Sequence, residues 1–403
     1  MAEMPGISAA RPVPPLSGES PGLAAVAGTG ALAGGLTGAG GLAGAGELPG
    51  PGEHAGHAAT SGGARIYQRS MTRRRLHAVA VLPPAFAVLC LFLCLLPIAR
   101  LVASRGRLPG RVRSAARLIA VIGAYLAAFE IPALLGVLRE GPRADQSAGQ
   151  TACPSCQRAY RRRLARFFGP GLAAAGMRIV RDPASAPIPA GRPVLLLFRH
   201  AGLLNAPFAS HITFEDLRRT PHIVGKSVLC ADPALGLLLR HLPMSLVRWN
   251  RAGRARVMTM MTDQARHAPA ETAILMGPEG TNFSAARRQR AIAKLHAQGR
   301  VGEAALAAGR AHVLPPHLTG VLALLQAAPG ADVVIVGHTG LESLLVWAAT
   351  LGCRQPADGA VHLTWWHVPA EEIPATSTER QAWLLDWWGR IDSWIGDHCH
   401  AAH

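Results

Sequence analysis

The chain has 403 residues, a formal net charge of +17 and a pI near 11.1. The length allows one large domain with appendages or two modest domains. The charge indicates an anionic partner, such as nucleic acid, an acidic membrane surface or phosphorylated substrates, although part of the arginine excess is what a GC-rich genome produces. The seven cysteines give no sign of a disulfide framework and favour a reducing compartment. The lone Cys153-Pro-Ser-Cys156 motif lacks a second ligand pair, so no metal site is expected.

The first stretch of the chain, residues 1–65, is a low-complexity sequence rich in glycine, alanine and proline. It contains almost no bulky side chains, so it cannot bury enough apolar surface to offset the chain entropy lost on folding. We therefore expect residues 1–65 to be a disordered tail.

Residues 72–140 hold two apolar stretches joined by a basic connector. The first, Ala78 to Ala99, has no formal charge and the length of a membrane helix, which needs roughly 20 apolar residues, although three prolines weaken it. The second, Leu118 to Leu138, is interrupted by Glu130 and Pro132. Two full spans would carry one arginine cluster across the membrane, against the positive-inside tendency. We predict one anchor or a re-entrant hairpin, in contact with membrane lipids on the cytoplasmic face of the inner membrane of a bacterium.

Residues 157–397 alternate between apolar runs and helical patterns, which predicts an α/β fold with a mostly parallel or mixed sheet flanked by helices. The basic and apolar stretch Tyr160 to Ile179 predicts a helix that leads into this domain. The predicted strands are Val194–Phe198, His222–Val224, Thr272–Met276, Asp332–Gly337 and Val361–Trp366, and the predicted helices lie near Ala234–His241, Arg254–His267, Ala285–Gln298 and Thr378–Ile395. Residues 398–403 are expected to form a tail.

Two of the predicted strand ends carry chemically useful residues. In "VLLLFRHAGLLN" a buried strand is followed by Arg199 and His200, with Asn205 five residues beyond the histidine. In "ILMGPEGTNF" a strand is followed by a Pro-Glu-Gly-Thr turn and then by a basic helix. Functional residues of such sheets collect where strands end, and a turn at a helix N-terminus suits a phosphate.

The order of several motifs carries a resemblance. After His200 come Lys226 in "IVGKSVL", Arg251 at the end of "LPMSLVRWNR", the block "MGPEGTNF" and the block "HVLPPHLTG". This order resembles the lysophospholipid and glycerolipid acyltransferase family of the 1-acylglycerol-3-phosphate acyltransferase type. That family has an H-x4-D motif, a hydrophobic block ending in arginine, a PEGT-R block and a late proline-containing block. The resemblance covers about Leu164 to Ile395 and implies a glycerol-3-phosphate acyltransferase-like fold behind an N-terminal membrane anchor.

The resemblance implies a membrane-associated enzyme that moves a fatty acyl group from a thioester donor to the hydroxyl of a lysophospholipid, with 1-acylglycerol-3-phosphate as the acceptor. Acyl-CoA or acyl-carrier protein would be the co-substrate, and no cofactor is implied. His200 would be the base, a task that suits a neutral histidine near pH 7, with Asn205 at its side. The residues implied at the substrates are Arg251, Gly280 and Thr281 on the acceptor phosphate, Glu279 in the same loop, and Arg199 and Lys226 as further phosphate contacts.

The chain departs from the family pattern at two positions. Asn205 stands where the family has an aspartate that accepts the second imidazole N–H, so Glu215 or Asp216 is a possible substitute if the following helix folds back. Asn282 stands where the family has arginine, and the nearby Arg287 and Arg288 are candidates to supply that charge.

Other interpretations stay open at this point. The chain could be a catalytically impaired lipid-binding member of the family, or an acyltransferase for another acceptor. A protein that binds nucleic acid or another anionic surface is a remote alternative; it rests on net charge alone, and no nucleic acid partner is expected. The last helix has one apolar face rich in tryptophan, which fits packing on the sheet or docking at a membrane interface.

Overall fold

The computed structural model describes residues 110–132, 154–226 apart from 186 and 203, 244–247, 251–344 and 359–400, with residue 135 and scattered residues between 80 and 101. All of them belong to the unit Thr60–His403. The predicted disordered tail, part of the predicted anchor and the predicted helix Ala234–His241 lie outside the described residues. Among the helices described, none is both long enough and apolar enough to cross a membrane.

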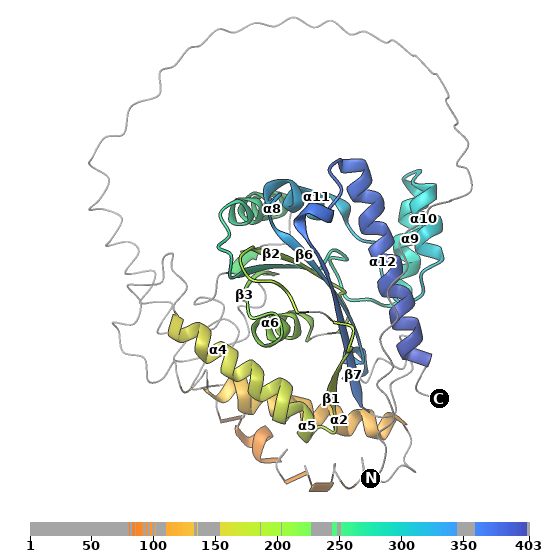
Figure 1. Cartoon of the computed structure of the whole chain (residues 1–403). Helices are drawn as coiled ribbons and strands as arrows, with labels where there is room; N and C mark the ends of the chain where they lie inside the picture. The colour runs from red at the N-terminus through yellow and green to blue at the C-terminus, as the bar shows by residue number, and fades with distance from the viewer. Residues whose placement is uncertain are drawn as a thin grey trace, which may run out of the picture. The chain divides into compact units, whose positions relative to one another are not determined.

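A seven-stranded sheet in the order β1-β7-β6-β2-β5-β3-β4 forms the centre of the domain (Figure 1). The strands are β1 (Arg178–Arg181), β2 (Val194–Phe198), β3 (Thr220–Lys226), β4 (Met244–Val247), β5 (Thr272–Met276), β6 (Asp332–Thr339) and β7 (Ala360–Val368). Neighbouring strands pair in parallel except β6 and β7, so β1 and β7 run opposite to the other five. The prediction of a mixed, mostly parallel α/β sheet is confirmed.

The central strands match their predicted bounds best. β2 and β5 begin and end where the apolar runs predict, because each is fully enclosed between two layers of helices. The sequence reasoning missed β1 and β4, which are the two edge strands of the sheet. Both are four residues long, and β1 begins and ends with arginine, so neither shows the continuous apolar run of a buried strand.

Helices cover both faces of the sheet. Alternate residues of β2 point to opposite faces: Leu196 packs among the helices on one side, and Leu195 and Leu197 pack among those on the other. The first side is covered by α2 (Gly110–Tyr125), η1 (Leu126–Glu130), α4 (Pro154–Arg166), η2 (Phe167–Gly171), α5 (Leu172–Ala174) and α6 (Asn205–Glu215). The second side is covered by α8 (Arg251–Arg266), α11 (Leu318–Ala327) and α12 (Ser377–His400), and α9 (Ala285–Ala297) packs with α10 (Val301–Ala308). Short helical turns, η4 (Leu341–Leu344) and η6 (Ala370–Glu372), follow β6 and β7.

Part of the second predicted membrane stretch belongs to the domain core. Ala120, Val121 and Phe129 are buried, and the Phe129 ring packs edge-on against Phe167 with centroids 5.8 Å apart. The core therefore begins before residue 157, the predicted start of the domain. At the other end, α12 continues through His400, into the predicted tail.

The tryptophan-rich face of α12 packs on the sheet, as the first of the two interpretations predicted. Leu384, Trp388, Ile391 and Ile395 are almost fully buried in the core of the second layer. The spacing of these side chains follows the period of a helix, so one face of α12 meets β6 and α11.

Replacing Ile391 with alanine should therefore lower the free energy of unfolding by about 2–5 kcal/mol, because the side chain is 0% exposed and leaves a cavity. Chemical denaturation of the Ile391→Ala variant measures this loss. Ser393→Ala, on the exposed side of the same helix, is the matched control and should change the stability by less than about 0.5 kcal/mol. An equal loss in both variants would contradict the packing of this face.

Candidate active site

Three adjacent parallel strands bring the predicted motifs together. β5, β2 and β6 are neighbours, and Leu197 of β2 aligns with Met276 on one side and Ile335 on the other. Parallel strands in register end at the same edge of the sheet. The segments that follow them, residues 199–205, 277–282 and 340–342, therefore meet at the carboxyl edge, where active sites of such sheets form.

His200 is half-buried at this edge and contacts two asparagine side chains. Its Nδ1 lies 2.5 Å from Asn282 Oδ1 and 2.8 Å from Asn205 Nδ2. In the tautomer that carries its proton on Nδ1, the ring donates this proton to Asn282 Oδ1. Nε2 is then the unprotonated nitrogen of the ring. This is the tautomer that a histidine acting as a base through Nε2 needs.

The two asparagines are bonded to each other. Asn205 Nδ2 donates to Asn282 Oδ1 over 3.1 Å, while Asn205 Oδ1 is buried without a hydrogen-bond partner among the described residues. Rotating both amides by 180° keeps the bond between them and makes Asn205 the acceptor for the His200 proton. Either arrangement supplies one amide oxygen to Nδ1. The predicted site residue Asn205 and the unpredicted partner Asn282 therefore act as a pair.

Gly277 makes room for the imidazole. A Cβ at this position would lie 2.9 Å from His200 Cδ2 and 3.4 Å from the Phe198 ring, so no larger residue fits beside the histidine. The Phe198 and His200 rings stack with centroids 6.1 Å apart. The sequence signal was a glycine directly after a buried strand, but its neighbour could not be inferred.

The Glu279 side chain is buried instead of facing solvent, and it holds the turn at residues 277–282 in place. Its carboxylate is buried and accepts hydrogen bonds from the His200 backbone N–H at 2.8 Å, from the Leu314 backbone N–H at 3.1 Å and from Trp388 Nε1 at 3.2 Å. Burial raises the pKa of Glu279 to about 7, although the Arg199 guanidinium and the three N–H donors act in the opposite direction. The side chain fixes the backbone at His200.

The prediction that Arg199 contacts a substrate phosphate is wrong. Its side chain is 0% exposed, because adjacent residues of an extended chain point to opposite sides and Arg199 points inward. The guanidinium is ion-paired with Glu342 and donates to the carbonyl oxygens of His312 and His338. Burial opposes ionisation of Glu342, yet the Arg199 charge holds its pKa below the usual value. This buried ion pair joins the segment after β2 to η4, on the core side of the candidate site.

Neither carboxylate that was considered as a substitute partner for His200 is available. Glu215 is bonded to Arg161 through both oxygens, at 2.7 and 3.3 Å, and Asp216 is bonded to Arg181 at 2.5 and 3.3 Å. Both lie at the far end of α6 from Asn205. Asn282, whose own position is the second departure from the family pattern, takes the role instead.

Of the two arginines expected to replace the family arginine, one lies at the site. Arg287 donates to the Asn282 carbonyl oxygen at 2.9 Å, whereas Arg288 points to the Ala308 and Arg310 carbonyl oxygens. Ser284 caps the N-terminus of α9 by accepting from the Arg287 backbone N–H. The basic helix therefore presents Arg287 next to the histidine loop.

The predicted phosphate-binding residues lie around the same edge. Lys226 ends β3 and Arg251 begins α8 after β4; their side chains lie outside the described residues. Thr281 is half-buried and lines a pocket beside Glu279. Gly280 adopts φ +65° and its N–H donates to the Gly277 carbonyl oxygen at 3.0 Å, so this N–H is engaged within the turn. Its role is to close the turn.

Residues 180–338, which contain the sheet core and the His200 site, match the Acyltransferase family model. The chain therefore contains an acyltransferase domain, as the resemblance predicted. One similar solved structure is the 1-acyl-sn-glycerophosphate (LPA) acyltransferase PlsC from Thermotoga maritima, with 14% sequence identity and a TM-score of 0.46. The match covers 71% of this chain and 98% of that one. No curated protein matches the chain in sequence.

The buried carboxyl group of Glu279 should give the fold a pH dependence that a Glu279→Gln variant lacks. The pKa is raised above its ordinary value of 4.5 to about 7, so between these values the folded state holds a proton that the unfolded state has released. The stability of the wild type should then fall by about 3 kcal/mol, relative to Glu279→Gln, as the pH rises from about 4.5 to about 7. Urea denaturation at several pH values measures this difference. A control substitution of the exposed Glu372 with glutamine should leave the slope as in the wild type, and a pH-independent difference for Glu279→Gln would refute the assignment.

Proposed function

We propose that the protein transfers a fatty acyl group from a thioester donor to the hydroxyl of a lysophospholipid, with 1-acylglycerol-3-phosphate as the acceptor. The observation that carries the proposal is the Asn282 amide oxygen 2.5 Å from His200 Nδ1: it is placed to accept an Nδ1 proton and so to leave Nε2 as the base, within residues that match the Acyltransferase family model. The specific acceptor rests on the family resemblance of the motifs around this site.

The chemistry requires one proton to move twice. His200 Nε2 removes the proton of the acceptor hydroxyl as its oxygen attacks the thioester carbonyl carbon, which becomes tetrahedral. When the intermediate collapses, the carbon–sulfur bond breaks, the new ester forms, and the imidazolium returns the proton to the departing thiolate. Asn282 and Asn205 keep the ring oriented through both transfers by holding the Nδ1 proton.

The acceptor phosphate has candidate partners at the same sheet edge. Lys226 ends β3, and Arg251 follows β4, so both lie at the carboxyl ends of strands parallel to β2. Thr281 lies two residues beyond Glu279, which bonds to the His200 backbone. Lysine and arginine at this edge suit a phosphate monoester carried close to the reacting hydroxyl.

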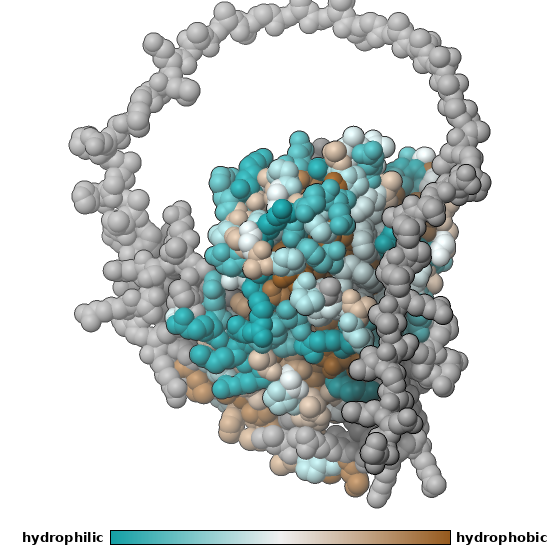
Figure 2. All heavy atoms as spheres, in the orientation of Figure 1, coloured by the Kyte–Doolittle hydropathy of each residue, from teal (hydrophilic) through white to brown (hydrophobic). Residues whose placement is uncertain are grey.

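We further propose that the chain works at the cytoplasmic face of a bacterial inner membrane, held by an N-terminal anchor or hairpin. Figure 2 shows apolar residues along the edge of the described region where α2 lies. The exposed apolar residues in this part of the chain are Phe86, Val88, Leu91, Leu95, Ile98, Leu101, Ile119 and Ile122. Contiguous exposed apolar surface of this kind marks protein or membrane contacts, and arginines flank it in sequence.

Removing the base tests the reaction. His200→Ala should lower acyl transfer from labelled acyl-CoA to lysophosphatidate by about 10²–10⁴-fold, the usual contribution of a general base. Asn205→Asp should retain or raise transfer, because a carboxylate can accept the Nδ1 proton and stabilise the imidazolium. Full activity in His200→Ala would refute the mechanism. Bound lysolipid without transfer in any variant, across several acceptors, would favour a lipid-binding protein that has lost catalysis.

The Asn282 side chain offers an independent test of how the histidine is held. Asn282→Ala should lower kcat by at least about tenfold, because Nδ1 loses its acceptor and the ring its preferred tautomer. Asn282→Asp should instead shift the acidic limb of the pH profile of kcat/KM to higher pH, since a negative charge beside the ring favours imidazolium. Circular dichroism verifies folding in both variants. Unchanged kcat in Asn282→Ala together with an unchanged profile in Asn282→Asp would show that Asn282 does not position the base.

A further inference from the structure

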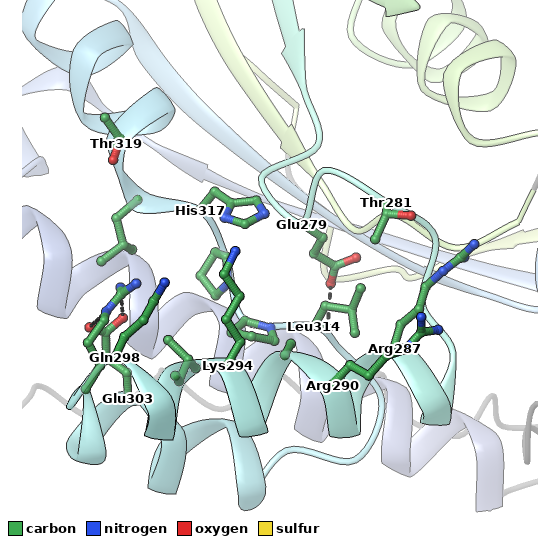
Figure 3. A pocket seen from close by; sticks show the side chains of 16 residues that line it. Glu279, Thr281, Arg287, Arg290, Lys294, Gln298, Glu303, Leu314, His317 and Thr319 are labelled. Carbon is green, nitrogen blue, oxygen red and sulfur yellow. Dashed lines mark hydrogen bonds and ion pairs between the residues drawn. The ribbon is translucent and has the colours of Figure 1, made fainter. Parts of the chain in front are cut away.

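A pocket of about 430 Å³ opens beside the turn at residues 277–282, between α9 and the segment that leads into α11 (Figure 3). Glu279 and Thr281 form one end of it. Because Glu279 also accepts the His200 backbone N–H, the wall of the pocket and the backbone of the catalytic histidine are bonded to each other. The pocket therefore lies next to the segment that holds His200. The volume lies within the range of small-molecule sites.

One face of α9 lines the pocket with positive charge. Arg287, Arg290 and Lys294 are spaced three and four residues apart, so all three lie on the same side of the helix. Within the described residues, none of the three is in an ion pair with a carboxylate. Arg300, also in the lining, is paired with Glu303 at 2.7 Å between Nε and Oε1. These three cationic side chains, none of them paired with a carboxylate among the described residues, thus line the same pocket.

The positive charge along α9 affects His317, which lies on the opposite wall of the pocket. Figure 3 shows Lys294 extending from α9 toward His317. Burial lowers the pKa of His317, and the positive charges of Lys294 and Arg300 lower it further. His317 therefore stays neutral at pH 7, able to donate or accept a hydrogen bond, while the field inside the pocket favours an anion.

The dimensions indicate more than one phosphate group. Arg287 and Lys294 are seven residues apart, which is about 10.5 Å along the helix axis. A row of this length has room for more than one phosphate group, each near a different cation. Leu314, Pro315 and Leu318 add apolar surface at the opposite wall, which suits the flat face of a base or the aliphatic part of a linker.

We propose that this pocket binds the phosphate-rich nucleotide end of an acyl-CoA donor, and that the donor's flexible arm delivers its thioester to His200. The inference rests on the proposed acyl transfer and specifies its donor: a coenzyme with a nucleotide diphosphate and a further phosphate, rather than a carrier protein. The row of three cations matches a chain of phosphates. The lysophospholipid phosphate then belongs to the Lys226 and Arg251 side of the site.

Binding of a donor that cannot react tests the pocket apart from turnover. We would titrate the full-length protein in detergent with desulfo-CoA and, separately, with glycerol 3-phosphate, by isothermal titration calorimetry. The double variant Arg290→Gln/Lys294→Gln should raise the Kd for desulfo-CoA by at least about tenfold, and binding should weaken with salt. The Kd for glycerol 3-phosphate should not change. Both side chains are on the exposed face of α9, so the fold should be retained.

The matched control is Arg158→Gln/Arg266→Gln, which removes the same two charges from exposed positions outside the pocket and should bind desulfo-CoA like the wild type. In steady-state assays the pocket variant should raise the KM for acyl-CoA and leave the KM for lysophosphatidate unchanged. A wild type that does not bind desulfo-CoA, an equal loss in the control, or a rise only in the lysophosphatidate KM each overturns the inference.

The outcomes also separate the two proposals. His200-dependent acyl transfer without pocket-dependent binding of desulfo-CoA refutes the donor pocket and leaves the reaction standing. Pocket-dependent binding without transfer to any lysophospholipid refutes the proposed reaction and leaves a coenzyme site on the protein.

Discussion

The buried carboxylate of Glu279 joins the segments on which the site depends. One oxygen accepts the backbone N–H of His200, which follows β2, and the other accepts donors from Leu314 and from Trp388 of α12. A buried carboxylate requires such donors, since leaving it without them would cost several kcal/mol. The loop, the sheet edge and the last helix are therefore held in one arrangement. The position of His200 is a consequence of that arrangement.

The two departures from the family pattern lie side by side in the structure. Asn205 and Asn282 replace an aspartate and an arginine, and their side chains lie 3.1 Å apart beside His200. The imidazole keeps an acceptor for its Nδ1 proton but loses the nearby carboxylate. The structure thus retains the orientation of the base and reduces the electrostatic stabilisation of its protonated form.

The sequence predicted the parts of the fold that depend on enclosure by apolar layers. β2 and β5 were predicted with their observed bounds because both faces of each are buried. The edge strands β1 and β4 were not predicted, because a strand of four residues with mixed polarity resembles a loop. Side-chain direction was also beyond reach: Arg199 and His200 are adjacent, yet one points into the core and the other into the site.

The partner of His200 shows why the site could be predicted only in part. Asn205 was identified through the resemblance of its H-x4-N spacing to the family's H-x4-D motif, and the structure places it at the start of α6, beside His200. Asn282 is 82 residues from the histidine in sequence, and its contact depends on the alignment of β2 with β5. The sequence marked it as an anomaly without a role. The structure places both unusual residues, Asn205 and Asn282, beside His200 Nδ1. Only the alignment of the strands in the folded protein brings them together.

The net charge of +17 acquires a different meaning once the arginines are placed. Several are structural: Arg199 is buried against Glu342, and Arg161 and Arg181 tie α4 and β1 to the end of α6. These contribute to the overall charge but offer little to a ligand. The row on α9 differs because Arg287, Arg290 and Lys294 line one pocket and, among the described residues, form no ion pair with a carboxylate. An anionic ligand is therefore favoured by the local arrangement of three side chains, and the total charge alone would have indicated neither its place nor its size.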